Sequence, residues 1–326
     1  MDQESISLFA LSSSRALGES VGRLLGIPLG AHTEKQFDDG EYKSRPAANV
    51  RGKDVFVIHA LHGDPEQSPD EKLMRLLFFL GALADAAAAR VTAVVSYLCY
   101  ARQDRKVRPN DPVTSRYVAR MFEAVGVSRV VALDVHNLAA FQNAFRLPTE
   151  HLEACSLFVD HFAAPLRDRD IVVVSPDAGG VKRAELFRQA LSRALGRTVA
   201  SAFVEKQRSD AGVGGESSVG QFAGRAAIII DDMICTGTTI VHAAQVCRDL
   251  GAHPVYAAAT HGVFAGDAAD ALADPALESI VVTNSIPLRK NIALAAPKLV
   301  VLDAATLFAA AIRDIHGGGS TDDFRG

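Results

Sequence analysis

The chain has 326 residues, of which 48% are hydrophobic and 22% are charged, and its formal net charge is −4. This composition excludes a disordered, collagen-like or disulfide-stabilised chain, and the small net charge gives no general reason to expect nucleic-acid binding. The length is sufficient for about two domains, each with its own hydrophobic core.

Apolar runs typical of buried strands alternate with helical patterns through the first half of the chain. The predicted strands span residues 55–58, 91–97 and 129–133, and the predicted helices span residues 73–89 and 114–125. Gly126 directly follows the second helix, which is the usual place for a glycine that ends a helix.

The same alternation continues in the second half. Strands are predicted over residues 171–174 and 226–230, and helices over residues 182–195 and 240–250. Continuous apolar strands separated by helices predict βαβ units built around parallel sheets. The boundary between the halves is weakly marked, with residues 148–153 as the first candidate and Pro165 as the second.

Neither the cysteines nor the N-terminus suggests secretion or a membrane. Cys99, Cys155, Cys235 and Cys247 lack the spacing of a zinc site or of a redox pair. The N-terminal residues lack the basic and apolar regions of a signal peptide, and the apolar stretch 76–89 is too short to span a bilayer. We therefore expect a cytoplasmic protein with no membrane partner and no nucleic-acid partner.

The most informative segment is the strand-to-helix connection over residues 228–239, I-I-I-D-D-M-I-C-T-G-T-T. Asp231 and Asp232 follow an apolar strand and precede a turn rich in hydroxyl groups. Ligands of parallel α/β sheets bind beyond the carboxyl ends of the strands, and a helix N-terminus attracts phosphate. Two carboxylates beside such a turn suit a sugar phosphate, because they can accept hydrogen bonds from vicinal hydroxyls. The alternative is an ordinary helix whose Asp and Thr residues act only as caps.

This segment resembles the phosphoribosyl-diphosphate loop of type I phosphoribosyltransferases. Other motifs narrow the resemblance: F-D-D-G-E at 37–41, Y-A-R-Q-D-R-K at 100–106, D-V-H at 134–136, S-P-D-A-G-G-V-K-R-A at 175–184, E-K-Q-R at 205–208, T-H-G at 260–262 and V-T-N-S-I-P at 282–287. Together, in order and spacing over nearly the whole chain, they are similar to the ribose-phosphate pyrophosphokinases, also called phosphoribosyl-diphosphate synthetases.

The resemblance implies an α/β fold with two tandem type I phosphoribosyltransferase-like domains, each a mostly parallel sheet flanked by helices. The N-terminal domain, on the ATP side, would span residues 1–150 and be joined by the C-terminal segment 303–326. The C-terminal domain, on the ribose-5-phosphate side, would span residues 151–302.

The implied activity is transfer of the diphosphoryl group of ATP to the 1-hydroxyl of ribose 5-phosphate, with Mg²⁺ as the cofactor. The implied assembly is a homodimer or homohexamer. Two alternatives stay open: a weakly active or regulatory paralogue of the synthetase, and a phosphoribosyltransferase that consumes the diphosphate.

The resemblance also assigns roles to individual residues. The ATP-binding residues would be Phe37, Asp39, Glu41, Arg102 and Gln103. The metal-binding residues would be His136 and Asp177, and the catalytic residues Lys206 and Arg208. The ribose-5-phosphate-binding residues would be Asp231, Asp232, Cys235, Thr236, Gly237, Thr238 and Thr239.

Two positions of the sugar-phosphate segment depart from the family pattern. Relatives usually carry Asp at the position of Cys235 and Gly at the position of Thr238. A thiol at a helix N-terminus can have a lowered pKa, so we hypothesise that Cys235 makes the enzyme sensitive to peroxide. Val107 and Arg146 also stand where relatives often have acids, so a second metal site is not predicted.

Overall fold

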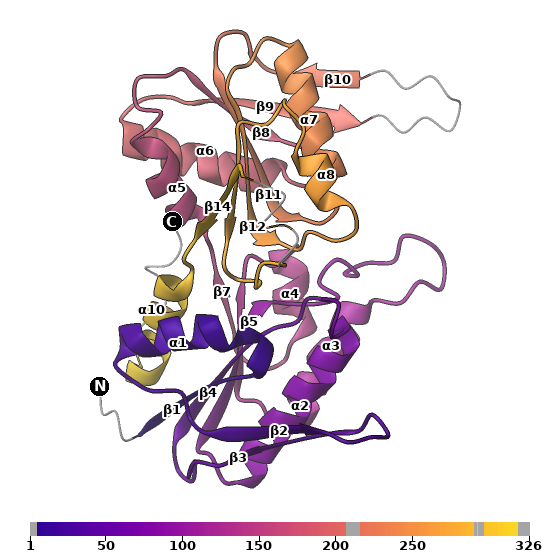
Figure 1. Cartoon of the computed structure of the whole chain (residues 1–326), viewed down its shortest axis with the longest axis vertical. Helices are drawn as coiled ribbons and strands as arrows, with labels where there is room; N and C mark the ends of the chain where they lie inside the picture. The colour runs from indigo at the N-terminus through magenta and orange to yellow at the C-terminus, as the bar shows by residue number, and fades with distance from the viewer. Residues whose placement is uncertain (1–4, 207–215, 290–291, 293–296, 319–326) are drawn as a thin grey trace. The chain divides into compact units, whose positions relative to one another are not determined.

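The computed structural model describes residues 5–206, 216–289, 292 and 297–318. These residues form two compact units. Unit 1 takes in the described residues of Met1–Glu153, Ser285–Pro287 and Asp303–Arg325, and unit 2 those of Ala154–Asn284 and Leu288–Leu302. Figure 1 shows that each unit is a sheet with helices on both faces.

Unit 1 is built on a five-stranded parallel sheet in the order β1-β4-β5-β6-β7. The strands are β1 (Ile6–Ala10), β4 (Asp54–Ala60), β5 (Arg90–Tyr97), β6 (Arg129–Leu133) and β7 (Thr149–Leu152). Every residue of β1 and β4 is buried, as expected for strands that are covered on both faces. A separate antiparallel hairpin is formed by β2 (His32–Gln36) and β3 (Tyr42–Pro46).

The helices of unit 1 lie on both faces of this sheet (Figure 1). They are α1 (Arg15–Leu25), α2 (Pro69–Asp85), α3 (Thr114–Ala124), α4 (Leu138–Ala144) and α10 (Ala305–Gly317). Helix α10 packs against α1, and His316 Nδ1 near its end lies 2.9 Å from the Asp54 carboxylate at the start of β4. This contact ties the C-terminal helix to the N-terminal half of the chain.

Unit 2 is built on a seven-stranded sheet in the order β10-β9-β8-β11-β12-β13-β14. Its strands are β8 (Ile171–Ser175), β9 (Ala200–Lys206), β10 (Glu216–Val219), β11 (Ala226–Ile234), β12 (Val255–Gly262), β13 (Ser279–Thr283) and β14 (Leu299–Leu302). The β9–β10 pair is antiparallel and the other pairs are parallel. The flanking helices are α5 (Cys155–Ala163), α6 (Val181–Leu195), α7 (Thr238–Asp249) and α8 (Ala268–Leu272).

The predicted fold class is confirmed: both units are α/β, with mostly parallel sheets flanked by helices. The assignment of ATP to one domain and of ribose 5-phosphate to the other stays a prediction. In the part of the chain that the structure describes, no helix is both long enough and apolar enough to cross a membrane.

The second helix of unit 1 differs at both ends from its predicted limits, residues 73–89. It begins at Pro69, because Ser68 and Glu71 form a capping box: the Ser68 hydroxyl accepts from Glu71 N, and the Glu71 carboxylate accepts from Ser68 N. It ends at Asp85, and two residues later Ala87 takes a positive φ of 63°. The alanine run past Asp85 therefore extended the apparent helix beyond its real end.

The fourth strand of the unit 2 sheet, β11, is longer than predicted, and this changes the position of the acids. The sequence places Asp231 and Asp232 in a loop after a strand that ends at residue 230. In the structure β11 continues to Ile234, because its pairing with β12 continues as far as Ile234 and Gly262. The two acids are therefore strand residues, and the loop begins at Cys235.

Candidate functional site

The acidic pair lies where β11 has a neighbouring strand on only one side. Pairing with β8 ends at Ile229, whereas pairing with β12 continues through Asp231. The side chains of Asp231 and Asp232 are 17% and 4% exposed. A regular strand therefore holds two adjacent carboxylates at the end of a parallel sheet, the usual location for ligand binding in this class of fold.

Arg183, near the start of α6, supplies the positive charge beside the acidic pair. Its Nη1 lies 3.6 Å from an oxygen of Asp231 and 3.6 Å from an oxygen of Asp232. Burial and the neighbouring Asp232 raise the pKa of Asp231 well above its usual range, while Arg183 opposes the rise. Arg183 alone therefore does not offset the negative charge of the two carboxylates. Hydrogen-bond donors of a ligand would stabilise the ionised form of the pair.

Nothing in the sequence alone distinguishes Arg183 from its neighbour Lys182. Both follow the glycines of S-P-D-A-G-G-V-K-R-A, and both could lie on the solvent face of a helix. The structure identifies Arg183 because its side chain is only 25% exposed and its guanidinium lies beside the acids of β11.

The turn after β11 leads into α7 through a glycine. Gly237 is the N-cap of α7 and has a φ of +79°, and an added Cβ there would come within 3.2 Å of the Leu272 side chain. No side chain among the described residues caps this helix. The hypothesis that Asp and Thr serve here only as caps is therefore wrong for α7, and its first N–H groups are available to an anion.

The hydroxyl-bearing residues of this turn face solvent. Thr236, Thr238 and Thr239 are exposed, Cys235 is half-buried, and the Thr236 and Thr238 hydroxyl oxygens lie 3.2 Å apart. The turn therefore combines exposed hydroxyls with a helix N-terminus, immediately after the buried carboxylates.

Asp177 lies in the tight turn between β8 and α6. Its carboxylate accepts a hydrogen bond from Gly180 N at 2.9 Å, and its carbonyl accepts one from the Ser175 hydroxyl at 2.7 Å. A Cβ at Gly180 would come within 2.8 Å of that hydroxyl, which explains the glycine. The Asp177 carboxylate is held in place while the residue remains exposed.

In unit 1, Phe37, Asp39 and Glu41 form the tip of the β2–β3 hairpin, and all three are exposed. Phe37 N donates to Glu41 O at 2.8 Å, and Glu41 N donates to the Asp39 carboxylate at 3.0 Å. The Lys35 ammonium lies 4.7 Å from the centre of the Phe37 ring, which is 39% exposed. The tip thus presents an aromatic face and two carboxylates to solvent.

The hairpin is anchored through Glu34 on β2. The Glu34 carboxylate accepts hydrogen bonds from the Ser12 hydroxyl and the Tyr42 hydroxyl, both at 2.6 Å, and contacts the His32 ring at 3.0 Å. Burial alone would raise the pKa of Glu34, but these hydrogen bonds outweigh it and lower the pKa to about 2. A half-buried ionised carboxylate therefore fixes the base of the hairpin.

Arg102 and Gln103 lie in the loop between β5 and α3, and both are exposed. Tyr100, near the start of this loop, has a φ of +59° and donates its hydroxyl hydrogen to the Asp70 carboxylate. Gln103 is held by its N–H to Tyr100 O at 3.0 Å and by the Thr114 hydroxyl at 2.5 Å. The Arg102 side chain is thus carried on a loop with defined hydrogen bonds.

His136 lies in the turn between β6 and α4 and is exposed. The preceding Val135 N donates to His151 Nε2 at 3.2 Å, and Asp134 has a φ of +38°. Predicted metal-binding His136 lies in unit 1, whereas Asp177 lies in unit 2. The described residues contain no group of three His, Cys, Asp or Glu side chains that could hold a metal ion.

The two predicted catalytic residues are only partly within the described chain. Lys206 is the last residue of β9, and its side chain is not described. Arg208 lies outside the described residues.

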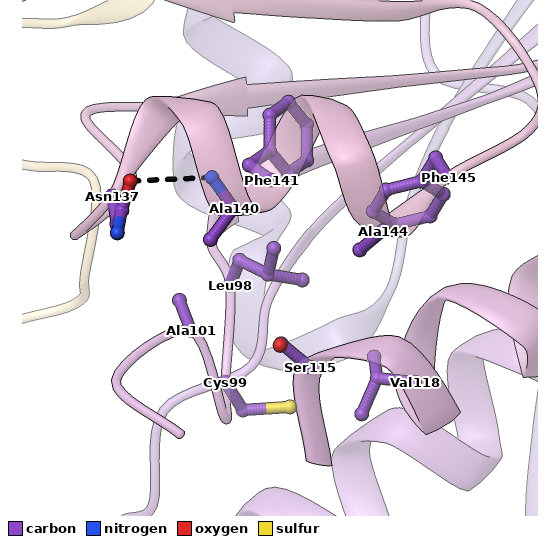
Figure 2. Close-up of a pocket in the computed structure, with 10 residues that line it drawn as sticks. All are labelled: Leu98, Cys99, Ala101, Ser115, Val118, Asn137, Ala140, Phe141, Ala144 and Phe145. Carbon is purple, nitrogen blue, oxygen red and sulfur yellow. Dashed lines mark hydrogen bonds between the residues drawn. The ribbon is translucent and has the colours of Figure 1, made fainter. Parts of the chain in front are cut away.

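A small apolar pocket lies in unit 1 between α3, α4 and the residues that follow β5 (Figure 2). It is lined by Leu98, Cys99, Ala101, Ser115, Val118, Asn137, Ala140, Phe141, Ala144 and Phe145. Burial raises the pKa of the Cys99 thiol to about 12, so this cysteine stays protonated. The pocket is adjacent to the loop that carries Arg102 and Gln103.

The whole chain is similar to known proteins. Residues 6–126 match the N-terminal domain of ribose phosphate pyrophosphokinase, and residues 203–325 match the phosphoribosyl synthetase-associated domain. The chain is 38% identical to ribose-phosphate pyrophosphokinase 1 of Streptococcus agalactiae, over 97% of this chain and 95% of the relative. It is also 38% identical to ribose-phosphate pyrophosphokinase of Bacillus caldolyticus, over 96% of each chain. The crystal structure of phosphoribosylpyrophosphate synthetase from Mycobacterium smegmatis superposes with a TM-score of 0.88 at 35% identity, covering 97% of this chain and 100% of the other.

Proposed function

The chain belongs to the ribose-phosphate pyrophosphokinase family, and from this membership we propose how its residues carry out the reaction. The enzyme transfers the diphosphoryl group of ATP to the 1-hydroxyl of ribose 5-phosphate and forms 5-phosphoribosyl 1-diphosphate and AMP. Catalysis of such a transfer depends on positioning and on electrostatic stabilisation rather than on a covalent intermediate.

The ribose 5-phosphate binds at the end of β11. Asp231 and Asp232 accept hydrogen bonds from the ribose hydroxyls, and the segment 235–239 holds the 5-phosphate through its N–H groups and hydroxyls. The observation that carries this assignment is the position of the buried carboxylate pair directly before a helix N-terminus that no described side chain caps. Arg183 lies beside both carboxylates and opposes the rise in the pKa of Asp231.

ATP binds to the two exposed segments of unit 1. The Phe37 ring stacks on the adenine base, and Asp39 and Glu41 accept hydrogen bonds from its amino group or from the ribose. Arg102 and Gln103 bind phosphate oxygens, for which the forked guanidinium is well suited. The exposure of all five side chains supports this assignment, because none of them is used in the core.

The positive charge in the transition state comes from Lys206 and Arg208. Lys206 ends β9 and Arg208 follows two residues later in the sequence, and β9 pairs with β8, the strand that leads to Asp177. The segment that follows Lys206 in the sequence contains Gly212, Gly214 and Gly215, and glycine is the residue with the fewest backbone restrictions. We assign this segment the role of bringing the lysine to the transferring phosphates.

Of the two residues assigned to the metal, Asp177 has the side chain that suits a Mg²⁺ ion brought by ATP. Asp177 offers a carboxylate oxygen, the ligand type that Mg²⁺ prefers, and it is exposed and oriented by Gly180 N. His136 is a poor direct ligand for this ion and would contact it through water or phosphate. When bound, the ion would neutralise phosphate charge.

We propose a homo-oligomer, on the basis of exposed apolar side chains on α2. Met74 and Phe78 are one helical turn apart and are 40% and 52% exposed. Apolar side chains grouped on a helix face are typical of subunit interfaces. Light scattering during size-exclusion chromatography tests this, and a monomer at micromolar concentration would contradict it. The cytoplasmic location stays a prediction.

The decisive experiment is an assay with ATP and ribose 5-phosphate, with and without Mg²⁺ and inorganic phosphate. We expect equal amounts of AMP and of 5-phosphoribosyl 1-diphosphate, and no product without the divalent ion. Release of diphosphate from 5-phosphoribosyl 1-diphosphate and a free base would instead indicate a phosphoribosyltransferase. If the purified chain were inactive by itself but stimulated an active synthetase, it would be the regulatory paralogue.

A further inference from the structure

We propose that Asn137 is a positioning residue for ATP: it ties the loop that carries Arg102 and Gln103 to the turn that carries His136, through a hydrogen bond to Asp104. This inference rests on the proposed roles of those three residues. Asn137 directly follows His136 in the sequence, and Asp104 directly follows Gln103.

Both ends of the Asn137 carboxamide are used. Its Oδ1 accepts a hydrogen bond from Ala140 N at 3.2 Å and so caps α4, as Figure 2 shows. Its Nδ2 donates to the Asp104 carboxylate at 2.7 Å. The opposite orientation of the amide would direct an oxygen at a carboxylate and an N–H at an N–H. The two partners therefore fix the orientation of the amide.

The rest of the loop is tied elsewhere. The Tyr100 hydroxyl donates a hydrogen bond to Asp70, and the Thr114 hydroxyl at the start of α3 donates one to Gln103. The bond from Asn137 holds the next residue, Asp104, to α4. The loop is thus connected to a different element on each side.

The apolar pocket explains why this hydrogen bond matters. It lies between α3 and α4 and is lined by Ala101 of the loop together with Asn137 itself (Figure 2). Ala101 borders this pocket, and atoms that line a hollow have fewer packing partners on that side. The hydrogen bonds at the edge of the pocket therefore contribute to the position of the loop on this side, whereas Leu98, Cys99 and Tyr100 pack on the core.

The bond between Asn137 and Asp104 is charge-assisted, because an amide donates to a carboxylate. Asparagine provides both the acceptor for the helix cap and the donor for the loop. Serine or aspartate could cap the helix equally well but could not donate this hydrogen bond from the same position. The choice of residue thus fits the bridging role better than a capping role alone.

A reciprocal exchange tests the proposal. Asn137→Asp keeps the cap but opposes two carboxylates, and we expect KM for ATP to rise ~10-fold with KM for ribose 5-phosphate changed less than about 2-fold. Asn137→Ser should give a smaller rise. The double variant Asn137→Asp, Asp104→Asn restores one amide and one carboxylate with their positions exchanged, and should return KM for ATP to within about 2-fold of the original value.

Three results would overturn the inference: an unchanged KM for ATP in Asn137→Asp, no recovery in the double variant, or an equal rise in both KM values with a lowered melting temperature. Calorimetric titration with ATP provides the same comparison of variants without turnover. Absence of AMP release by the unaltered chain would contradict the proposed activity, whereas ATP affinities that are insensitive to the exchange would contradict only the role of Asn137.

Discussion

The two substrate sites proposed for this chain are constructed in opposite ways. In unit 2, Asp231 and Asp232 belong to a strand of the central sheet, and their side chains are 17% and 4% exposed. In unit 1, the residues assigned to ATP lie at a hairpin tip and in a loop, and all are exposed.

The two sites are held in place by different interactions. The backbone ladder of β11 fixes the acidic pair, so its chemistry depends on charge and burial, as the raised pKa of Asp231 indicates. The hairpin tip depends instead on side-chain hydrogen bonds at a distance from it, above all those of Glu34. Substitutions at the first site should act through electrostatics, and those at the second through position.

The largest effect is expected outside both sites, at the end of β9. Lys206→Ala should lower turnover roughly 10²–10³-fold or more while ATP still binds, because the substitution removes the cation to which we assign stabilisation of charge in the transition state. A coupled assay of AMP release measures it, with the exposed Lys43→Ala as the matched control. Near-normal turnover of Lys206→Ala would contradict the role.

The next effect concerns the buried pair. Asp231→Asn should lower kcat/KM for ribose 5-phosphate by about 10²-fold, because an amide is a much weaker acceptor than a carboxylate. KM for ATP should stay unchanged. Asp249→Asn, an exposed acid at the end of α7, is the control. An equal loss for both substrates would show that the two sites are not separate.

The same substitution should stabilise the fold at alkaline pH. Because the pKa of Asp231 is raised in the folded chain, its contribution to stability is greatest below about pH 4, the range of an unfolded carboxyl, and is lost as the pH rises through the raised value. Asn does not ionise. Denaturant unfolding at alkaline pH should therefore show a larger free energy of unfolding for Asp231→Asn, and a smaller one would contradict the assigned direction of the pKa shift.

Much of the sheet site could be predicted from sequence, because its signals are local. The strand Arg129–Leu133 has the predicted limits, and the apolar run before Asp231 indicated a buried strand correctly. The end of β11 could not be predicted, because adjacent aspartates are typical of loops. Pairing with β12 nevertheless extends the strand beyond Asp231 and Asp232. Tertiary pairing overrides local propensity there.

The hairpin was not predicted as a pair of strands, because its sequence has no apolar alternation. The segments His32–Gln36 and Tyr42–Pro46 are largely polar, and Ser44 is the only fully buried residue of the two strands. The roles of Arg183 and Asn137 depend on partners 48 and 33 residues away, Asp231 and Asp104. One sequence contains no local signal for such contacts.

Glu34 tests whether the hairpin site depends on its base. The pKa of Glu34 is lowered to about 2, so its stabilising contribution is present above about pH 4.5 and is lost as the pH falls toward 2. Glu34→Gln should lower the free energy of unfolding at pH 7 by about 1–2 kcal/mol, after solvent screening is allowed for, and should flatten its dependence on pH between 4.5 and 2. Thermal unfolding across this range measures it. Glu19→Gln, on the exposed face of α1, should change neither quantity.

Arg183 tests whether the sheet site depends on charge. Because Arg183 opposes the rise in the pKa of Asp231, Arg183→Ala should raise this pKa further, and protonation should then compete with sugar binding at higher pH. We expect kcat/KM for ribose 5-phosphate to fall ~10-fold at pH 7 and its acidic limb to move to higher pH. Arg183→Lys, which keeps the charge, should retain most of the activity. A uniform loss at every pH would indicate a positional role instead.

The smallest effect is expected at the hairpin tip. Phe37→Ala should raise KM for ATP by about 5-fold. Stacking of a base on an aromatic side chain contributes ~1–3 kcal/mol of binding free energy, and we expect the low end of this range because Phe37 is exposed. Phe37→Tyr should retain the affinity, since it keeps the ring. Leu24→Ala, an exposed apolar residue of α1, is the control for general surface effects. KM for ribose 5-phosphate should be the same in all three variants. If it rose together with KM for ATP, the hairpin tip would contribute to both sites, and the separation between a charge-controlled site and a position-controlled site would fail.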